Sequence, residues 1–292
     1  MEIWIVNRLA LENTPIRQPL KVGRCTLIGV AMIAAAFVAG CTSSAPGRGP
    51  GFAEVDPGVA SSGNIASLSD VIQRNPNDPT AYLTRGGAYA RSARYQEAIH
   101  DFSQAIKLDP NSADAYTNRA LAYRQIGQND KALEDFNQAI AVNPNHTSAY
   151  IGRANLLRTQ GNLVAALADL DQAIRLAPEN PQSFHARGLI YQKQGDCVQA
   201  ISNFDNAIDR NPFVAAPYLA RGQCEIAGGK YDAAIEDFNA ALNVDTKIPG
   251  GWSGLGLAYE RQGNRSKAQE SYNHALTVDP NDELAHAGLA RL

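Results

Sequence analysis

The sequence has little that would support catalysis or metal binding. Only 4 of its 292 residues are cysteine, and none is in the C-x-x-C spacing of a redox motif or a zinc site. The 5 histidines are scattered without a nucleophile or carboxylate at motif spacing, and the sequence contains no glycine-rich phosphate loop. We therefore expect no enzyme activity, no catalytic residues, no metal and no cofactor.

Basic residues are not in excess either. Lys and Arg number 26 against 29 Asp and Glu, which gives a net charge of −3. A nucleic-acid partner would require clustered Lys and Arg, so we do not expect one.

An apolar run near the N-terminus is short for a membrane span. Residues 26–40 are uncharged and mostly apolar, 15 residues, whereas a transmembrane helix needs about 20. Arg17, Lys21 and Arg24 precede the run, and Ala39-Gly40 closes it. This order is typical of a signal peptide, although an uncleaved signal anchor would share it.

The segment Val38-Ala39-Gly40-Cys41 resembles the lipobox of bacterial lipoproteins, in which the cysteine is acylated and becomes the first mature residue. The resemblance implies that residues 1–40 are a signal peptide and that Cys41 carries fatty acids such as palmitate. It also implies a place in the cell envelope, facing the periplasm. Thr42, where aspartate would resemble an inner-membrane retention signal, favours the outer over the inner membrane. Residues 41–63, rich in Ser, Gly, Pro and Ala, would be the lipidated cysteine and a flexible tether with a reach of roughly 25 Å.

Beyond residue 63 the chain repeats with a period of 34. The dipeptides that mark the period are Asn75-Pro76, Asp109-Pro110, Asn143-Pro144, Ala177-Pro178, Asn211-Pro212 and Asp279-Pro280. We divide the chain into six repeats, at residues 79–112, 113–146, 147–180, 181–214, 215–248 and 249–282. Apolar or small residues recur at positions 4, 8, 11, 20, 24 and 27 of the repeat, so each repeat is predicted to be two amphipathic helices.

The two helices of a repeat are too small to bury their own apolar faces. Five repeats have a glycine between the helices, where a left-handed residue is expected, and the first has Ala93 there. Neighbouring pairs must therefore stack into a solenoid with a concave side. The pattern resembles the tetratricopeptide repeat over residues 64–292, which implies an all-α, right-handed superhelical solenoid of helix-turn-helix repeats.

Both ends of the repeat region resemble caps. Residues 64–78 would be an N-terminal capping helix, and residues 283–292 a C-terminal one. An incompletely covered apolar end at Leu284, Leu289 and Leu292 would favour a homodimer, whereas a small frayed cap would not.

In most repeats the first predicted helix carries an arginine and the second predicted helix carries an aspartate. Position 7 is arginine in the first five repeats, and the sixth repeat has Leu255 there and Ser271 in place of the acid at position 23. We predict a structural ladder of ion pairs, because a half-buried guanidinium without a partner costs several kcal/mol. Its pairs are Arg85 with Asp101, Arg119 with Asp135, Arg153 with Asp169, and Arg221 with Asp237. In the fourth repeat Asn203 replaces the acid, so Asp205 or water is expected to partner Arg187. An arginine ladder that binds a polyanion is the alternative.

Cys197 and Cys224 fall on helices that should be neighbours. They would form a disulfide in an oxidising compartment, or remain two buried thiols.

In tetratricopeptide domains the first helices line most of the inner surface, and some members clamp a carboxylate tail there with Lys, Asn and Arg. This sequence lacks that clamp. The predicted inner surface instead has small and partly apolar side chains, with basic and amide side chains at its edge. The predicted peptide-binding residues are Leu83, Thr117, Asn118, Leu121, Arg124, Ile151, Asn155, Arg158, His185, Leu189, Gln192, Leu219, Gln223 and Leu257. Such a groove suits an apolar peptide or helix. Alternatively, the leucines pack on their own helices.

Together these features predict a non-enzymatic adaptor of the bacterial cell envelope that binds a protein or peptide in its groove. The alternatives are a homo-oligomer assembled through the C-terminal helix and an accessory subunit of an envelope enzyme complex. No motif identifies the partner or the envelope process.

Overall fold

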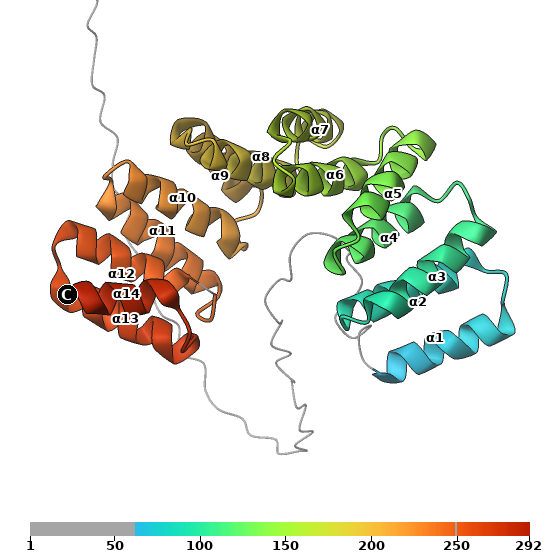
Figure 1. Cartoon of the computed structure of the whole chain (residues 1–292), viewed down its shortest axis with the longest axis horizontal. Helices are drawn as coiled ribbons and strands as arrows, with labels where there is room; N and C mark the ends of the chain where they lie inside the picture. The colour runs from blue at the N-terminus through green and yellow to red at the C-terminus, as the bar shows by residue number, and fades with distance from the viewer. Residues whose placement is uncertain (1–61, 249) are drawn as a thin grey trace, which may run out of the picture. The chain divides into compact units, whose positions relative to one another are not determined.

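The structure, a computed structural model, describes residues 62–248 and 250–292, and Figure 1 traces them from blue to red. These residues form fourteen α-helices and no strand. The first helices of the six repeats are α2 (Pro79–Arg91), α4 (Ala113–Gln125), α6 (Thr147–Thr159), α8 (Pro181–Lys193), α10 (Ala215–Ala227) and α12 (Gly251–Gln262). The second helices are α3 (Tyr95–Leu108), α5 (Asn129–Val142), α7 (Leu163–Leu176), α9 (Cys197–Arg210), α11 (Tyr231–Val244) and α13 (Arg265–Val278). The end helices are α1 (Ser62–Arg74) and α14 (Glu283–Arg291).

Each first helix ends where the backbone turns left-handed. Gly127, with φ of 74°, follows α4, and its N–H donates to the carbonyl of Arg124 at 3.1 Å. Glycine adopts this conformation without steric cost, which explains its place between the helices. Ala93 adopts a φ of 58° in the first repeat, the one described non-glycine residue with positive φ.

The large side chain at position 24, which is aromatic in five repeats and Leu170 in the third, fills the centre of each helix pair. Phe102 is fully buried, and a Cβ added to Gly86 on α2 would lie 2.7 Å from its ring. The small residue at position 8 is therefore needed so that the two helices can approach across the ring. A Cβ added to Gly152 of the next repeat would likewise clash with the ring of Phe136. One aromatic side chain thus packs both within its repeat and against the next.

Successive first helices contact one another along the stack: α2 with α4, α4 with α6, and so on to α12 with α14. Within the described residues no second helix contacts the second helix of the next repeat. The first helices therefore lie on the inner side of the stack, and α5 and α7 lie outside α4 and α6 in Figure 1. The all-α solenoid predicted from the period of 34 is confirmed.

The helix α14 is fastened to the last repeat by polar and apolar contacts. Arg291 donates two hydrogen bonds of 2.8 Å to Glu260 on α12, which also accepts a 2.6 Å bond from the hydroxyl of Tyr272 on α13. Leu289 and Leu292 pack on the cluster around Tyr272. Leu284 is 37% exposed, so part of the apolar end remains open.

The N-terminal features predicted from sequence, residues 1–40, Cys41 and the tether as far as residue 61, lie outside the described residues. Among the helices that the structure describes, none has the length and apolarity needed to cross a bilayer.

Candidate functional site

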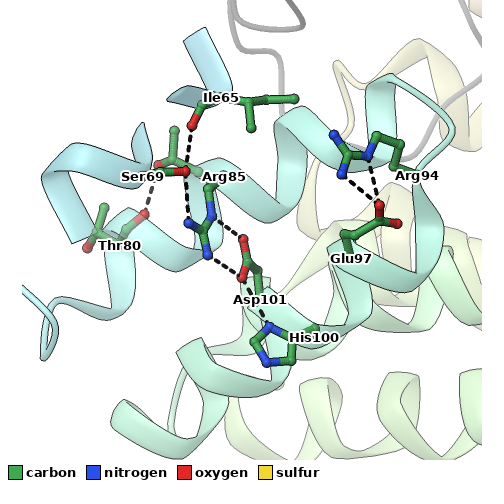
Figure 2. A network of polar contacts seen from close by, with 9 residues as sticks. Ile65, Ser69, Thr80, Arg85, Arg94, Glu97, His100 and Asp101 are labelled. Carbon is green, nitrogen blue, oxygen red and sulfur yellow. Dashed lines mark hydrogen bonds and ion pairs between the residues drawn. The ribbon is translucent and has the colours of Figure 1, made fainter. Parts of the chain in front are cut away.

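The structure brings together all four predicted Arg–Asp pairs. Figure 2 shows the first, in which Nε and Nη2 of Arg85 donate to the two carboxylate oxygens of Asp101 at 2.7 and 2.8 Å. Arg119 and Asp135 repeat these distances, and Arg153 holds Asp169 at 2.8 and 2.7 Å. These paired hydrogen bonds match the planar guanidinium to the planar carboxylate. The hydrogen bonds to Asp101 raise the pKa of Arg85 above its usual value.

Each ladder arginine has a second partner that the sequence analysis missed. The remaining guanidinium nitrogen reaches back to position 25 of the preceding repeat, so that Arg85 donates to the hydroxyl of Ser69 on α1 at 3.0 Å (Figure 2). Arg119 contacts Ser103 in the same way, at 3.0 Å. Position 25 is Ser, Asn or Asp in every repeat and in the N-terminal cap, a signal that could have been found. The ladder therefore joins neighbouring repeats as well as the two helices of one repeat.

The predicted partner of Arg187 is wrong. Arg187 binds Asn203 at 2.7 Å and, at the same distance, Asp171 of the preceding repeat. Asp205 instead binds Arg221 of the following repeat at 2.6 Å. Position 25 faces the next repeat, since Ser69, Asp171 and Asp205 each bind the arginine of the repeat that follows. The carboxylate that is missing at position 23 of the fourth repeat is thus supplied by position 25 of the third repeat.

The fifth repeat holds two carboxylates on one guanidinium. Arg221 binds both Asp237 and Asp205, at 2.6 Å each, and these hydrogen bonds, with Asp237 first, raise its pKa. Burial raises the pKa of Asp237 in spite of its hydrogen bonds from Arg221, and the charges of Glu225 and Asp205 add to the rise. In the sixth repeat Leu255 is 4% exposed, and Ser271 donates to the carbonyl of Lys267 at 2.9 Å. The same position between the two helices is therefore occupied by an ion pair in the fifth repeat and by an apolar side chain in the sixth.

The first helices carry all the predicted peptide-binding residues. We call the surface formed by α2, α4, α6, α8, α10 and α12 the first-helix face. Leu121 and Ile151 lie in the core, 3% and 5% exposed, so packing explains them, as the alternative proposed. Leu83, Leu189 and Leu219 are half-buried against core clusters. Leu257 is half-buried and belongs to none of the core clusters. The apolar part of the face is therefore smaller than predicted.

Polar side chains make up much of the remaining face. Thr117 and Asn118 are nearly buried, and the hydroxyl of Thr117 has no hydrogen-bond partner. Gln192 donates to the carbonyl of Ala220 at 3.1 Å and to the side chain of Gln223 at 3.3 Å. Of these groups, the amide of Gln223 is exposed and can donate to or accept from a bound backbone.

Basic groups lie among them. Burial, followed by the charge of Arg158, lowers the pKa of Arg124. The same two causes lower the pKa of His185 to about 4, so this imidazole is neutral at pH 7. The positive charge of this part of the face at neutral pH thus comes from Arg124 and Arg158 and not from His185.

The sulfur atoms of Cys197 and Cys224 are 2.8 Å apart, as free thiols on α9 and α10. Burial, with Cys197 second, raises the pKa of the Cys224 thiol to about 12. Cys224 is buried and Cys197 is half-buried, so the placement allows a disulfide or two thiols of which one is buried.

No metal-ligating cluster of His, Cys, Asp or Glu occurs within residues 62–248 and 250–292. Two open depressions, of about 480 and 340 Å³, lie on α5 and between α4 and α5. Neither is lined by a residue of the predicted groove.

Comparison with known proteins identifies the repeat. Profiles described as tetratricopeptide repeat match residues 117–181, 185–251 and 249–282, and a further TPR repeat profile matches residues 94–127. A search of curated protein sequences found no significant match.

Solved structures share the fold at low sequence identity. One is the APC/C hetero-tetramer Cut9-Hcn1, with a TM-score of 0.71 and 22% identity over 80% of this chain and 47% of that one. This chain thus spans less than half of that protein. PilW, a type IV pilus biogenesis factor, has a TM-score of 0.65 and 20% identity over 72% and 98% of the two chains. YrrB, a TPR protein with an unusual peptide-binding site, has a TM-score of 0.51 and 24% identity over 65% and 98%.

The profiles span most of the six repeats, and each solved structure shares the stacked helix pairs. Such repeats generally form non-enzymatic scaffolds for protein–protein interaction. The chain belongs to the tetratricopeptide repeat family.

Proposed function

We propose that the protein is a non-enzymatic adaptor of the bacterial cell envelope, which binds a protein or peptide on its first-helix face. The observation that carries the proposal is the contact between successive first helices, which makes one continuous surface from α2 to α12. Exposed polar groups on this surface, such as the amide of Gln223, can donate to or accept from the backbone of a bound segment.

The proposed anchor is an acyl group at Cys41, followed by a tether that ends near residue 63. The support is the lipobox resemblance of Val38-Ala39-Gly40-Cys41. A type IV pilus biogenesis factor of the same fold illustrates one envelope process that such a protein could serve. The lipid would hold the adaptor in the outer membrane, and the tether would let the repeats reach a partner in the periplasm.

Labelling with an alkyne analogue of palmitate tests the anchor. Cells producing the wild-type chain should yield a labelled protein in the membrane fraction, and a Cys41→Ser variant should be unlabelled. Cys25→Ser is the matched control and should keep the label, because residue 25 would be removed with the signal peptide. An unlabelled wild-type protein would rule out the anchor.

A steric block tests the binding surface. Gln223 is exposed on α10, and Glu236 is exposed on α11 on the outer side of the same repeat. We expect Gln223→Trp to reduce recovery of the proteins that co-purify with the wild-type chain, and Glu236→Trp to leave recovery unchanged. Equal recovery with both variants would argue against the first-helix face.

A further inference from the structure

The first helix of the stack, α1, exposes a face that the second helix of every repeat buries. Leu68 and Val71 of α1 lie 34 residues before Phe102 and Ala105, so they occupy positions 24 and 27 of a second helix. Position 24 is fully buried in all six repeats, and the alanine at position 27 is at most 3% exposed. Leu68 is only half-buried, and Val71 is 40% exposed. Among the described residues α1 contacts α2 alone, so this face has no first helix against it.

The last helix, α14, exposes the opposite half of a repeat. It contacts α12 and α13, as each earlier first helix contacts the repeat before it. A Cβ added to Gly288 would clash with the ring of Tyr272, as one added to Gly254 would clash with Phe238 one repeat earlier. Ala290, at position 8, is exposed, although this position is buried in all six first helices from α2 to α12. The exposed face of α14 is therefore the one that a first helix presents to the second helix of its own repeat.

The two open faces match at the positions of the ion-pair ladder. Positions 7 and 23 hold arginine with aspartate or asparagine in five repeats, and leucine with serine, Leu255 and Ser271, in the sixth. In α14 position 7 is Leu289, and in α1 position 23 is Ser67. The two end helices together would thus have the leucine and serine of the sixth repeat, and their contact would bury no unpaired arginine or aspartate.

The two faces also compensate each other in volume. In the second repeat Tyr116, at position 4, packs on the cluster that contains Ala139, at position 27. The corresponding residues of the end helices are His286 on α14 and Val71 on α1. A ring smaller than tyrosine would face a side chain larger than alanine, so the filled volume changes little, which close packing requires.

We infer that α14 of one copy of this protein packs against α1 of a second copy, so that the two end helices complete a composite repeat. Burial of Leu68, Val71 and Ala290 drives the contact, since independent solenoids normally end in a polar face. The contact joins two different surfaces and leaves each terminal copy with one open end, so it builds a chain of copies or a closed ring. It extends the stack and leaves the first-helix face open, and it therefore goes beyond the proposed function and does not depend on it.

Blocking one end at a time tests the contact on the protein purified in detergent as cells produce it. Val71→Lys places a charge in the open face of α1, and Ala290→Lys places one in the open face of α14. In sedimentation velocity the wild type should grow beyond a dimer as its concentration rises. Each variant should need at least about tenfold more protein to associate, because burying an unpaired charge is costly. Val198→Lys, at a 79% exposed position of α9, is the matched control and should associate like the wild type.

An equimolar mixture of the two variants tests the head-to-tail geometry. Val71→Lys keeps an intact α14 and Ala290→Lys keeps an intact α1, so at concentrations where each alone is monomeric the mixture should form a dimer and nothing larger. This dimer would also show that both variants are folded. A mixture that stays monomeric, or a wild type that is monomeric at every concentration, would overturn the inference.

A symmetric contact between two α14 helices predicts a different pattern. Dimers would then persist in Val71→Lys and disappear in Ala290→Lys, and this result would also overturn the inference. Gln223→Trp leaves both end helices intact and should associate like the wild type, so the outcome is separate from the test of the first-helix face.

Discussion

Replacing Arg119 by leucine tests whether the ladder is held by pairing. Nε and Nη2 of Arg119 lie 2.7 and 2.8 Å from the oxygens of Asp135, and the two side chains are 19% and 7% exposed. Arg119→Leu leaves the Asp135 carboxylate buried without its counter-ion. Removing one partner of a buried pair costs about 3–5 kcal/mol, and the partial exposure of Arg119 places the expected loss near the lower end, about 3 kcal/mol.

The sixth repeat supplies the matched double variant. Leucine and serine stand at these positions there, as Leu255 and Ser271, and both are buried without an ion pair. The double variant leaves no unpaired buried charge, and a serine at position 135 can donate to the main-chain carbonyl four residues earlier, as Ser271 does to Lys267 at 2.9 Å. Arg119→Leu/Asp135→Ser should therefore lie within about 1 kcal/mol of the wild type.

Urea unfolding with hydrogen exchange on α4 and α5 provides the assay. Repeat arrays need not unfold in one step, so the local exchange rates report the affected repeat directly. Arg175→Leu, at an exposed position of α7, is the control and should change stability by less than about 0.5 kcal/mol. If Arg119→Leu were no less stable than the double variant, the ion pair would not be what stabilises α4 against α5.

Three further outcomes follow from single sites. Ala93→Gly should raise the free energy of unfolding by about 0.5–1 kcal/mol, because the relief of left-handed strain exceeds the entropy that glycine adds to the unfolded chain; a loss of stability in urea unfolding would contradict this. Oxidised glutathione should join Cys197 to Cys224, closing a loop worth roughly 3.5 kcal/mol, whereas two titratable thiols in the oxidised, denatured protein would refute the prediction. The pKa of His185 is about 4 when folded and near 6.5 when unfolded, so its contribution is present above pH 6.5 and is lost as the pH falls. Between pH 7 and pH 4.5 the wild type should lose about 2 kcal/mol more stability than His185→Asn, and equal losses in urea unfolding would contradict this.

The helix pairs could be predicted because the same few positions repeat with the same residue types. Alanine at positions 20 and 27 and an aromatic residue or leucine at position 24 recur at a spacing of three or four residues, which indicates one buried face of a helix. The left-handed turn was predictable from glycine, and Ala93 adopts the same conformation because both flanking helices impose it.

Contacts between repeats were harder to predict. Arg85 and Asp101 could be paired because arginine and acid disappear together in the sixth repeat. Asp205 was assigned to the wrong arginine, because the period of 34 does not show which side of a second helix faces the following repeat. Leu121 raised the same difficulty, since a leucine on a first helix can face either the groove or the neighbouring helix, and the stacking angle decides which.

Site-specific photo-crosslinking in intact cells tests the binding surface most directly. A photoreactive residue at position 223, on α10, should crosslink to a partner protein, and one at position 236, on α11 of the same repeat, should not. Crosslinks from position 236 with none from position 223 would show that partners bind the outer side of the stack, and the account of the first-helix face would be wrong.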